Sequence, residues 1–350
     1  MKKHDLETPA LVMDLDAMEH NLATMAEFSR KACVNLRPHF KNHAILALAA
    51  RQVKAGAVGI TVARVRHAEA LVEHGIQSVL IANEVVDEQS IKRLLDLSRR
   101  AEIIVAVDNP KIITGMGRLC RNAGHPLHVV IDLEIGLARC GAALEDSLSL
   151  AQLAVGSGLR VRGLMGYEGH LQKLPDTDEN LKLRRAAAQT LIETRRLFEQ
   201  SGIPVDIITT GGTGTHKIFA DYPGVVEVQV GSYLLMETIY EPYAPDFRLG
   251  LTVLATVVST AEGDHLVLDA GMKAISSEKG LPRIKDFEGL RLSALHAEHG
   301  VVQIKGSSTS LSVGDKVELW VAYSDATLHL HRDMYGVRNG IVEEVFKIEY

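Results

Sequence analysis

Lys41 is the first side chain in the sequence whose type and setting indicate chemistry. It follows the short β-type run LRPHF that starts at Leu36, and His39 and His43 stand on either side of it. A lysine amine can form a Schiff base with a carbonyl compound, and a histidine can exchange protons near neutral pH. An isolated lysine is usually only a surface charge, so its chemistry depends on what lies beside it.

Two glycine-rich turns supply a candidate partner for Lys41. They are TTGGTGT from Thr209 and GSY from Gly231. Glycine turns expose backbone N–H groups, which together with hydroxyls form a donor set for a phosphate dianion. If the fold brings this phosphate site and the lysine amine together, they predict pyridoxal phosphate, bound to Lys41 as a Schiff base. The other interpretation of these residues is a sugar phosphate substrate, with Lys41 as a surface charge.

The elements that must position these residues repeat along the chain. From residue 36 to about 235, a β-type run, a polar turn and a helical stretch alternate. The β-type runs begin at Leu36, Val58, Ser78, Glu102, Leu127, Val161, Asp206 and Val226. Apolar residues at three and four spacing predict helices over 43–55, 63–74, 87–100, 109–122, 144–157 and 180–201. Eight such units predict a parallel (β/α)8 TIM barrel, whose chemistry sits at the carboxyl ends of the strands.

The pattern changes after Arg248 to short alternating runs separated by Gly and Asp turns. This pattern predicts an antiparallel β domain. We therefore expect an α/β protein with a barrel over residues 14–247 and a C-terminal antiparallel β domain over 248–350. Residues 1–13 include a strand-like run from Ala10, which we expect to join the second domain.

Composition limits the classes of partner. The chain has 350 residues, 46% hydrophobic residues and a formal net charge of -6, without a dense basic run. These features argue against nucleic acid or an anionic membrane as the main partner and favour a small-molecule substrate. Three scattered cysteines suit a reducing compartment, and no run is apolar enough for a signal peptide or a membrane span. We expect a cytoplasmic protein.

A series of stretches in chain order resembles the D-threonine aldolase and D-serine dehydratase family. They are TPALVMDLDAMEHN, LRPHFKNH, IANEVV, DLEIGLARCG, GYEGH, TTGGTGTH, VQVGSYLLME, VLDAGMKAISSEKGLP and GDKVELWV. This family belongs to the alanine-racemase-like, fold-type III pyridoxal phosphate enzymes. The resemblance implies the barrel, the cofactor and a homodimer in which the partner's C-terminal domain completes the active site.

The resemblance also implies roles for individual residues. Lys41 takes the position of the Schiff-base lysine, and Arg139 that of the arginine beside the cofactor's phenolic oxygen. Tyr167 and His170 take the positions of cofactor-packing and acid/base groups. The phosphate-binding turns match Thr210, Gly211, Gly212, Gly231, Ser232 and Tyr233. The residue types alone leave simpler roles open. Arg139 could be only an ion-pair partner, and His170 could be only a structural histidine.

Gln229 falls where alanine racemases carry an arginine that faces the pyridine nitrogen. An arginine would keep that nitrogen unprotonated and weaken the ring as an electron sink. A neutral amide can donate or accept a hydrogen bond, so it leaves both states open. Gln229 is therefore compatible with extensive carbanion stabilisation, although it could also simply fill the barrel.

Tyr323 is the departure from the family pattern. The metal-activated members have a histidine, one residue, and then a cysteine or aspartate that together hold a divalent ion such as Mn²⁺, Mg²⁺ or Zn²⁺. Here the pattern is Tyr323-x-Asp325. On a regular strand these two would share one face with Thr327, His329 and His331.

Three interpretations of this departure remain open. Asp325 could still hold a metal, with Tyr323 as phenolate or with a nearby histidine. Alternatively the metal is lost and Tyr323 is an acid/base group tuned by Asp325. In the third, Tyr323 is packing and Asp325 a solvated turn residue.

The expected function is a pyridoxal phosphate-dependent lyase that acts on a small D-amino acid, with a D-β-hydroxy amino acid as the expected substrate. Retro-aldol cleavage and β-elimination are both compatible with the resemblance. The alternative is a metal-independent racemase or epimerase that uses Lys41 and Tyr323 as opposed bases. A non-catalytic carrier of pyridoxal phosphate is the weaker alternative, because its single-barrel relatives lack a C-terminal β domain.

Overall fold

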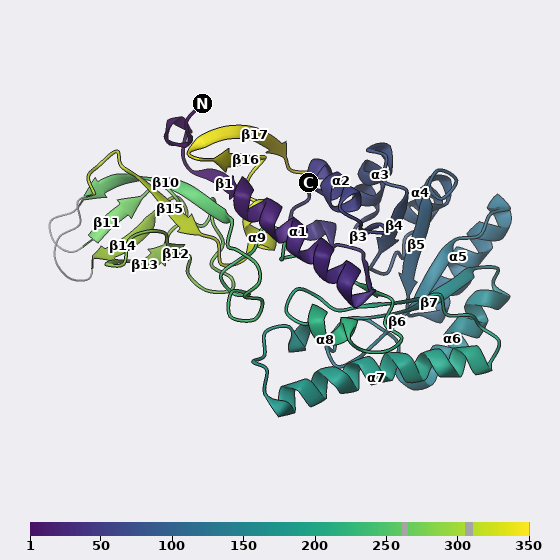
Figure 1. Cartoon of the computed structure of the whole chain (residues 1–350). Helices are drawn as coiled ribbons and strands as arrows, with labels where there is room; N and C mark the ends of the chain where they lie inside the picture. Colours follow the sequence, from purple (N-terminus) through teal and green to yellow (C-terminus); the bar gives the residue numbers. More distant parts are fainter. Residues whose placement is uncertain (261–264, 305–310, 350) are drawn as a thin grey trace. The chain divides into compact units, whose positions relative to one another are not determined.

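The computed structural model describes residues 1–260, 265–304 and 311–349, and it divides into two compact units (Figure 1). The barrel unit comprises Met25–Lys41 and Leu48–Gly231. The β unit comprises Met1–Thr24, Asn42–Ala47 and Ser232–Tyr350. Residues 14–24, 42–47 and 232–247, which the sequence assigned to the barrel, group with the β unit.

Eight parallel strands form the sheet of the barrel unit, in the order β2-β9-β8-β7-β6-β5-β4-β3. A parallel bridge between His39 and Thr61 joins the continuation of β2 to β3 and closes the ring. The strands lie where the eight β-type runs predict them, and the barrel is confirmed. Their bounds are β2 Asn35–Leu36, β3 Ile60–Val62, β4 Ser78–Ile81, β5 Glu102–Val107, β6 His128–Leu133, β7 Arg160–Gly166, β8 Ile207–Thr210 and β9 Glu227–Val228.

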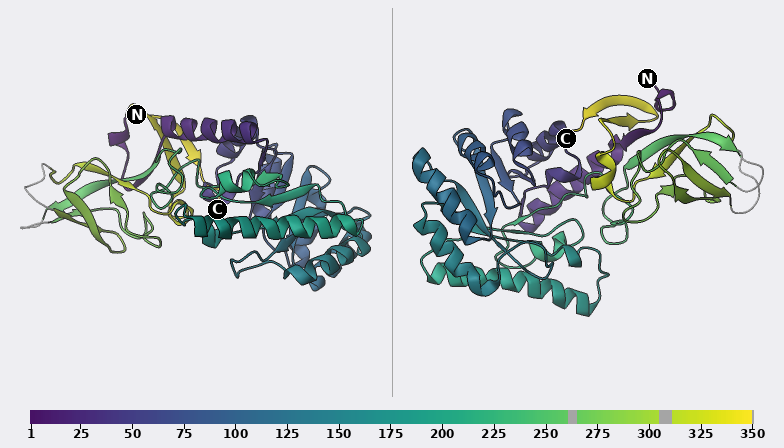
Figure 2. Two further views of the ribbon diagram at one scale, coloured as in Figure 1. Left: turned by 60° about the horizontal axis from the view of Figure 1, so that its bottom comes forward. Right: turned by 180° about the vertical axis from the view of Figure 1, so that it is seen from behind.

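The helices of the barrel unit lie on the outer side of these strands (Figure 2). They are α3 Val65–Glu73, α4 Glu88–Leu97, α5 Pro110–Ala123, α6 Leu144–Gly156, α7 Asp178–Gln200 and α8 His216–Ala220. Local signals set their ends: the Asn109 side chain caps α5, Pro110 occupies its first turn, and Gly124 ends it in the left-handed conformation. Helices α1 (Leu15–Ala32) and α2 (Leu46–Lys54) have residues in both units, and α1 and α8 were not among the predicted helices.

The apolar residues packed inside the barrel show which face of each strand points inward. Its apolar layer consists of Leu80, Ile104, Ala106, Val130, Met165 and Ile207. Nearer the amino ends of the strands, Arg37 donates to Glu227 at 2.8 Å inside the barrel. Because side chains alternate along a strand, Asp132, Tyr167, Thr209 and Gln229 lie on the inward faces at the carboxyl ends. These positions define the rim on which Lys41 was expected.

The β unit contains a nine-stranded sheet with the main order β13-β14-β11-β10-β1-β16-β17, while β15 pairs with β10 and β12. The sheet is mixed and not wholly antiparallel, because β1 runs parallel to β16 while it pairs antiparallel with β10. No described helix is long and apolar enough to cross a membrane. The strands are β1 Ala10–Asp14, β10 Leu251–Thr260, β11 His265–Leu268, β12 Arg283–Ile284, β13 Leu290–Leu295, β14 Gly300–Ile304, β15 Lys316–Trp320, β16 Asp333–Arg338 and β17 Ile341–Lys347.

Candidate functional site

Lys41 lies in a short 3₁₀ turn, Phe40–Asn42, two residues beyond the bridge of His39 to Thr61. Its backbone N–H donates to Nδ1 of His39 at 3.4 Å. Phe40 is 0% exposed and Asn42 1% exposed, whereas Lys41 between them is exposed. Two buried neighbours therefore anchor the turn, and the lysine lies at the carboxyl end of the barrel strands.

Arg139 and Tyr167 are brought together from the loops that follow β6 and β7. The guanidinium carbon of Arg139 lies 5.4 Å from the centre of the Tyr167 ring, within the range of a cation–π contact. The carboxylate of Glu134 orders the Arg139 loop, because it accepts the backbone N–H groups of Gly136 and Arg139. A Cβ on Gly136 would lie 2.8 Å from the imidazole of His170, so the exposed His170 packs against the same loop.

Glu168 is a buried carboxylate beneath the first glycine-rich turn. Its Oε1 accepts hydrogen bonds from Gln172 Nε2 and Thr215 Oγ1, both at 2.5 Å. Its Oε2 accepts from Thr210 Oγ1 and from the N–H of Gly211, both at 3.2 Å. Burial raises the pKa of Glu168, and the bonds from Thr215, Gly211 and Thr210 oppose that rise.

The glycines of this turn are required by packing against Gln172. The Gly214 N–H donates to Gln172 Oε1 at 3.0 Å, and the Gly212 N–H donates to Thr215 Oγ1 at 3.1 Å. A Cβ at Gly214 would lie 1.9 Å from the Gln172 carbonyl oxygen, and one at Gly212 would lie 2.7 Å from its side-chain amide. Gly211 has a φ of 77°, which an L side chain rarely adopts. The turn is therefore fixed from within the barrel unit.

Other groups at this end of the barrel fit a phosphate. The backbone N–H groups of Gly231 and Ser232 make no hydrogen bond within the described residues. The Oγ1 of Thr209 is buried on the inward face of β8 and also lacks a partner there. A buried hydroxyl without a partner is costly, and backbone N–H groups at the same end of the strands can bind an anion, so this set suits an anionic ligand.

Gln229 and Tyr233 differ in their surroundings. Gln229 is half-buried, and its backbone N–H donates to the carbonyl of Thr210 at 3.0 Å. It lies on the same face of β9 as Glu227, hence inward. Tyr233 is only 1% exposed, and its ring lies 5.7 Å from that of Phe247 within the β unit. The Tyr233 ring is thus part of that core.

Asp132, which sequence reasoning missed, has a strongly shifted carboxyl. Its pKa is raised to about 8, first by burial and then by the charge of Glu84, with which it also shares a hydrogen bond. Asp108 raises it further, whereas the cationic Arg139 lowers it. The only available signal was an acid at or just beyond the carboxyl end of three consecutive apolar runs, at residues 84, 108 and 132.

Asp132→Asn should flatten the pH dependence of folding stability. The folded carboxyl keeps its proton up to a pH of about 8, whereas an unfolded one loses it near pH 4. The folded state thus binds more protons between these values, and stability falls as the pH rises. From about pH 5 to 8, the wild type should lose on the order of 3–4 kcal/mol relative to the variant. Urea unfolding of both proteins measures this difference, and parallel curves would refute it.

Tyr323 and Asp325 lie at the start of a short helix, α9 (Ser324–Leu328), so the predicted strand is wrong. Tyr323 is the N-cap residue, and both Thr327 N–H and Thr327 Oγ1 donate to its carbonyl. His331 lies beyond the helix and its Nε2 bonds the Ala274 carbonyl oxygen at 2.7 Å. The predicted shared face with Thr327, His329 and His331 therefore does not exist.

The phenol of Tyr323 has the wrong chemistry for a metal ligand. Burial, followed by the negative charges of Asp325 and Glu278, raises its pKa well above the ordinary value, and its hydroxyl is hydrogen-bonded to Asp325. A neutral phenol is a poor ligand, which leaves one carboxylate at this position. Among the described residues, no group of three His, Cys, Asp or Glu side chains could hold a metal ion. The donor set does not fit the family's metal pair.

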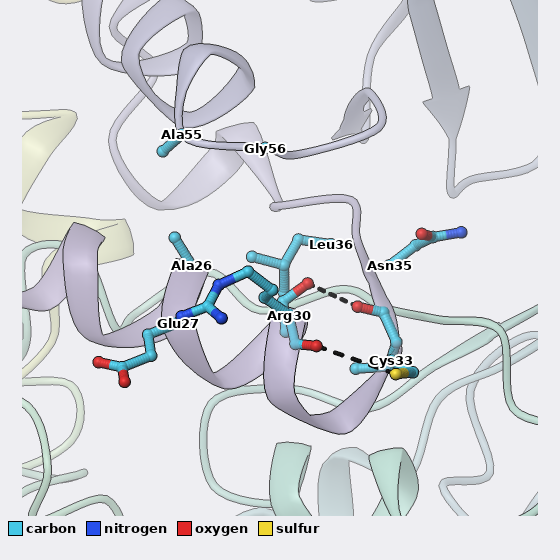
Figure 3. Close-up of a pocket in the computed structure, with 10 residues that line it drawn as sticks. Ala26, Glu27, Arg30, Cys33, Asn35, Leu36, Ala55 and Gly56 are labelled. Atoms are coloured by element: carbon cyan, nitrogen blue, oxygen red, sulfur yellow. Dashed lines mark hydrogen bonds between the residues drawn. The ribbon is translucent and has the colours of Figure 1, made fainter.

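A separate cavity of about 540 Å³ lies beside α1 and the start of β2 (Figure 3). Glu27, Arg30 and Cys33 line it on the α1 side, and Asn35 lines it at the first residue of β2. The start of a barrel strand lies at the amino end, opposite the rim that carries Lys41. This cavity is therefore not part of the candidate site.

Comparison with known proteins decides the family. Residues 13–238 match the family described as "Alanine racemase, N-terminal domain", and residues 250–337 match "Putative serine dehydratase domain". The chain belongs to this alanine-racemase-like family. The relatives that align with nearly the whole sequence include aldolases, which are lyases, and the family depends on pyridoxal phosphate.

Individual members of the alanine-racemase-like family align over nearly the whole chain. A D-threonine aldolase of Arthrobacter sp is 35% identical, covering 98% of this chain and 92% of that protein. A 3-hydroxy-D-aspartate aldolase of Paracoccus denitrificans is 31% identical, covering 99% and 93%. The crystal structure of D-threonine aldolase from Filomicrobium marinum superposes with a TM-score of 0.95 at 32% identity, covering 99% and 96%.

Proposed function

We propose that this protein is a pyridoxal phosphate-dependent lyase that cleaves a small D-β-hydroxy amino acid. The observation that carries the proposal is the rim of the barrel, where an exposed Lys41, the Arg139–Tyr167 pair and unpartnered phosphate donors stand at the same end. The similar proteins support the substrate class, since they include a D-threonine aldolase, a 3-hydroxy-D-aspartate aldolase and a D-threo-3-hydroxyaspartate dehydratase.

The cofactor would be held by groups on that rim. Lys41 would bind it covalently, the N–H groups of Gly231 and Ser232 would bind its phosphate, and Arg139 would face its phenolic oxygen. Gln229 would face the ring nitrogen. When bound, pyridoxal phosphate withdraws electrons from the substrate bond that breaks at the α-carbon.

Proton transfer at the β-hydroxyl distinguishes the possible reactions. A retro-aldol cleavage needs a base for this hydroxyl, whereas an elimination needs an acid. Because its pKa is raised, Tyr323 is a weak acid and is almost never a phenolate at neutral pH, so it suits donation of a hydrogen bond and not removal of a proton. Asp325 and the exposed His170 are the candidate bases. A racemase would need Tyr323 to take a proton, and the raised pKa disfavours that alternative.

A product assay tests the proposal. The cofactor-loaded protein is incubated with D-threonine, D-serine or D-threo-3-hydroxyaspartate, each with EDTA or with added Mn²⁺. Glycine with an aldehyde identifies an aldolase, and an oxoacid with ammonia identifies a dehydratase. Inversion of configuration without cleavage would overturn the lyase and support a racemase, whereas cofactor binding without turnover would support a carrier.

Tyr323→Phe separates a catalytic phenol from a packing role. Phenylalanine keeps the ring that faces Lys279 but removes the hydroxyl bonded to Asp325. We expect kcat to fall by about 10²-fold, the usual cost of losing one proton-transfer group, with little change in melting temperature. Unchanged kcat would favour packing.

Tyr323→His is the matched control, because it restores the histidine of the metal-activated members. Imidazole is a good ligand for Mn²⁺ or Zn²⁺ and Asp325 would remain beside it. This variant should become stimulated by added metal, whereas the wild type should respond weakly. Equal stimulation of both proteins by metal would mean that the native pair holds an ion.

We also propose a homodimer whose C-terminal domains complete the partner's active site. The support is the family resemblance, since the members with this pair of domains are expected to share it. Sedimentation at several protein concentrations tests the dimer, and a monomer that retains full activity would exclude the shared site.

A further inference from the structure

Glu237 is a buried carboxyl that contacts two segments far apart in the sequence of the β unit. It is 1% exposed and lies between Ser232 and Ser324. Its Oε2 accepts both the backbone N–H and the hydroxyl of Ser324, and its Oε1 accepts the hydroxyl of Ser232 at 3.1 Å. One side chain therefore fixes the start of α9 and the middle residue of the second glycine-rich turn, Ser232.

Asn42 completes the same network from a third segment. Its Nδ2 lies 2.7 Å from Ser324 Oγ, 3.2 Å from Asp325 Oδ1 and 3.4 Å from Ser232 Oγ. A carboxylate only accepts hydrogen bonds, so Asp325 fixes the orientation of this amide. Asn42, Ser324 and Glu237 are each 1% exposed, whereas Ser232 and Asp325 at the edge of the network are half-buried. The centre of the network is therefore shielded from water, which strengthens its hydrogen bonds.

The members of this network are next in the chain to residues of the candidate site. Asn42 follows Lys41, Ser232 follows Gly231, and Ser324 stands between Tyr323 and Asp325. A buried carboxyl adds little net stability compared with a well-packed apolar side chain, but it fixes the geometry of the groups bonded to it. The three segments carry residues of the candidate site, and the function of those residues depends on their exact positions.

We propose that Glu237 is a positioning residue, which sets the place of the Ser232 amide and of the Tyr323–Asp325 pair. The inference rests on the proposed function. Glu237 does not touch substrate or cofactor and acts through Ser232 and Ser324. Loss of its carboxyl should therefore affect two separable properties, cofactor affinity through Ser232 and turnover through Ser324.

Glu237→Ala and Glu237→Gln form the decisive pair. Alanine leaves the Ser232 and Ser324 donors without an acceptor. Glutamine keeps an oxygen for both Ser324 donors, and its NH₂ can donate to the Ser232 hydroxyl, which can rotate. We expect Glu237→Ala to weaken cofactor binding about 10-fold and to lower kcat about 10²-fold, and Glu237→Gln to restore most of both.

The control is Glu241→Ala, in the same segment. Glu241 is exposed and pairs with Arg283, so its loss should change neither cofactor affinity nor kcat. Cofactor affinity is measured by titrating the apoprotein with pyridoxal phosphate and following tyrosine and tryptophan fluorescence. kcat and KM are measured with the D-amino acid that the wild type cleaves.

Two outcomes would overturn the proposal. One is a Glu237→Ala variant that melts at a lower temperature but keeps the wild-type cofactor affinity and kcat. The other is an equal loss in the Gln and Ala variants, because then hydrogen-bond geometry would not be the cause. The affinity measurement remains informative even if the wild type cleaves no D-amino acid, so it separates failure of this inference from failure of the proposed function.

Single serine variants keep the test valid if Glu237→Ala does not fold. Ser232→Ala should weaken cofactor binding and leave the unfolding midpoint nearly unchanged. Ser324→Ala should lower kcat while cofactor affinity stays at the wild-type value. The same change in both variants, or none in either, would contradict a carboxyl that positions two separate segments.

Discussion

Lys41→Ala should abolish turnover, lowering kcat/KM by at least about 10³-fold, and should remove the visible absorbance of the cofactor-loaded protein. The amine is the one group proposed to bind the cofactor covalently, and no neighbouring lysine occupies that turn. Because Lys41 is exposed, the free energy of unfolding should change by less than about 0.5 kcal/mol. Spectroscopy, steady-state kinetics and urea unfolding of the same preparation measure these three effects.

Lys54→Ala is the matched control for Lys41→Ala. Lys54 is an exposed lysine at the end of α2 and should tolerate the change in all three measurements. Added ethylamine should partly restore turnover in Lys41→Ala, since it supplies the missing amine. A Lys41→Ala protein that keeps its colour after dialysis, and to which the cofactor stays linked after borohydride reduction and denaturation, would refute the covalent role.

Among the substitutions described, Glu168→Ala should destabilise the protein most. The free energy of unfolding should fall by about 3–5 kcal/mol. The change leaves four buried donors, from Gln172, Thr215, Thr210 and Gly211, without their common acceptor. The glycine-rich turn should then lose its shape, and cofactor affinity should fall with it. Urea unfolding and titration of the apoprotein with pyridoxal phosphate measure the two effects.

Two control variants identify the cause. Glu168→Gln should also be destabilised, by about 1–3 kcal/mol, because its NH₂ would face donors on whichever side it points. Glu134→Ala, at the end of the neighbouring strand, removes an acceptor of two backbone N–H groups at a less buried position and should cost about 1 kcal/mol. Equal stability of Glu168→Ala and the wild type would show that the turn holds its shape without the carboxylate.

The barrel could be predicted from the sequence because its signals are local and repeated. Each strand is a short apolar run, and each is followed by a stretch with helical periodicity. The runs from Leu127 and Asp206 correspond to strands β6 and β8, and the rim positions of Lys41 and Thr210 follow from the parallel order. Fold class and the location of the chemistry thus depend on patterns within about twenty residues.

Residues 323–331 show where local patterns fail. Their alternation favours a strand, but Ser324 N–H is bound by Glu237, 87 residues earlier in the chain, and Thr327 bonds back to Tyr323. These contacts start a helix, and an aspartate in its first turn favours it further. A contact between distant segments decided the local structure, so periodicity alone could not identify it.

The buried carboxyls were missed for a related reason. Glu168 stands in GYEGH between Tyr167 and His170, which drew attention because their types are familiar in catalysis. A glutamate next to a glycine at a strand end is a usable signal, since the turn can bring backbone N–H groups onto it. Glu237 carries no comparable signal, because its partners are Ser232 and the distant Ser324.

The chain passes between the two compact units at residues 24/25, 41/42, 47/48 and 231/232, and two of these crossings lie directly at Lys41 and Gly231. This connectivity limits how the protein can be dissected. A barrel excised as residues 48–231 would lack the strand that carries Lys41, and one excised as 25–231 would still contain the 42–47 segment of the other unit without its partners. Gene fusion, circular permutation or truncation of this protein should therefore keep these crossings intact. New termini are better placed in the turns between helices and strands at the amino ends of the barrel strands, opposite Lys41.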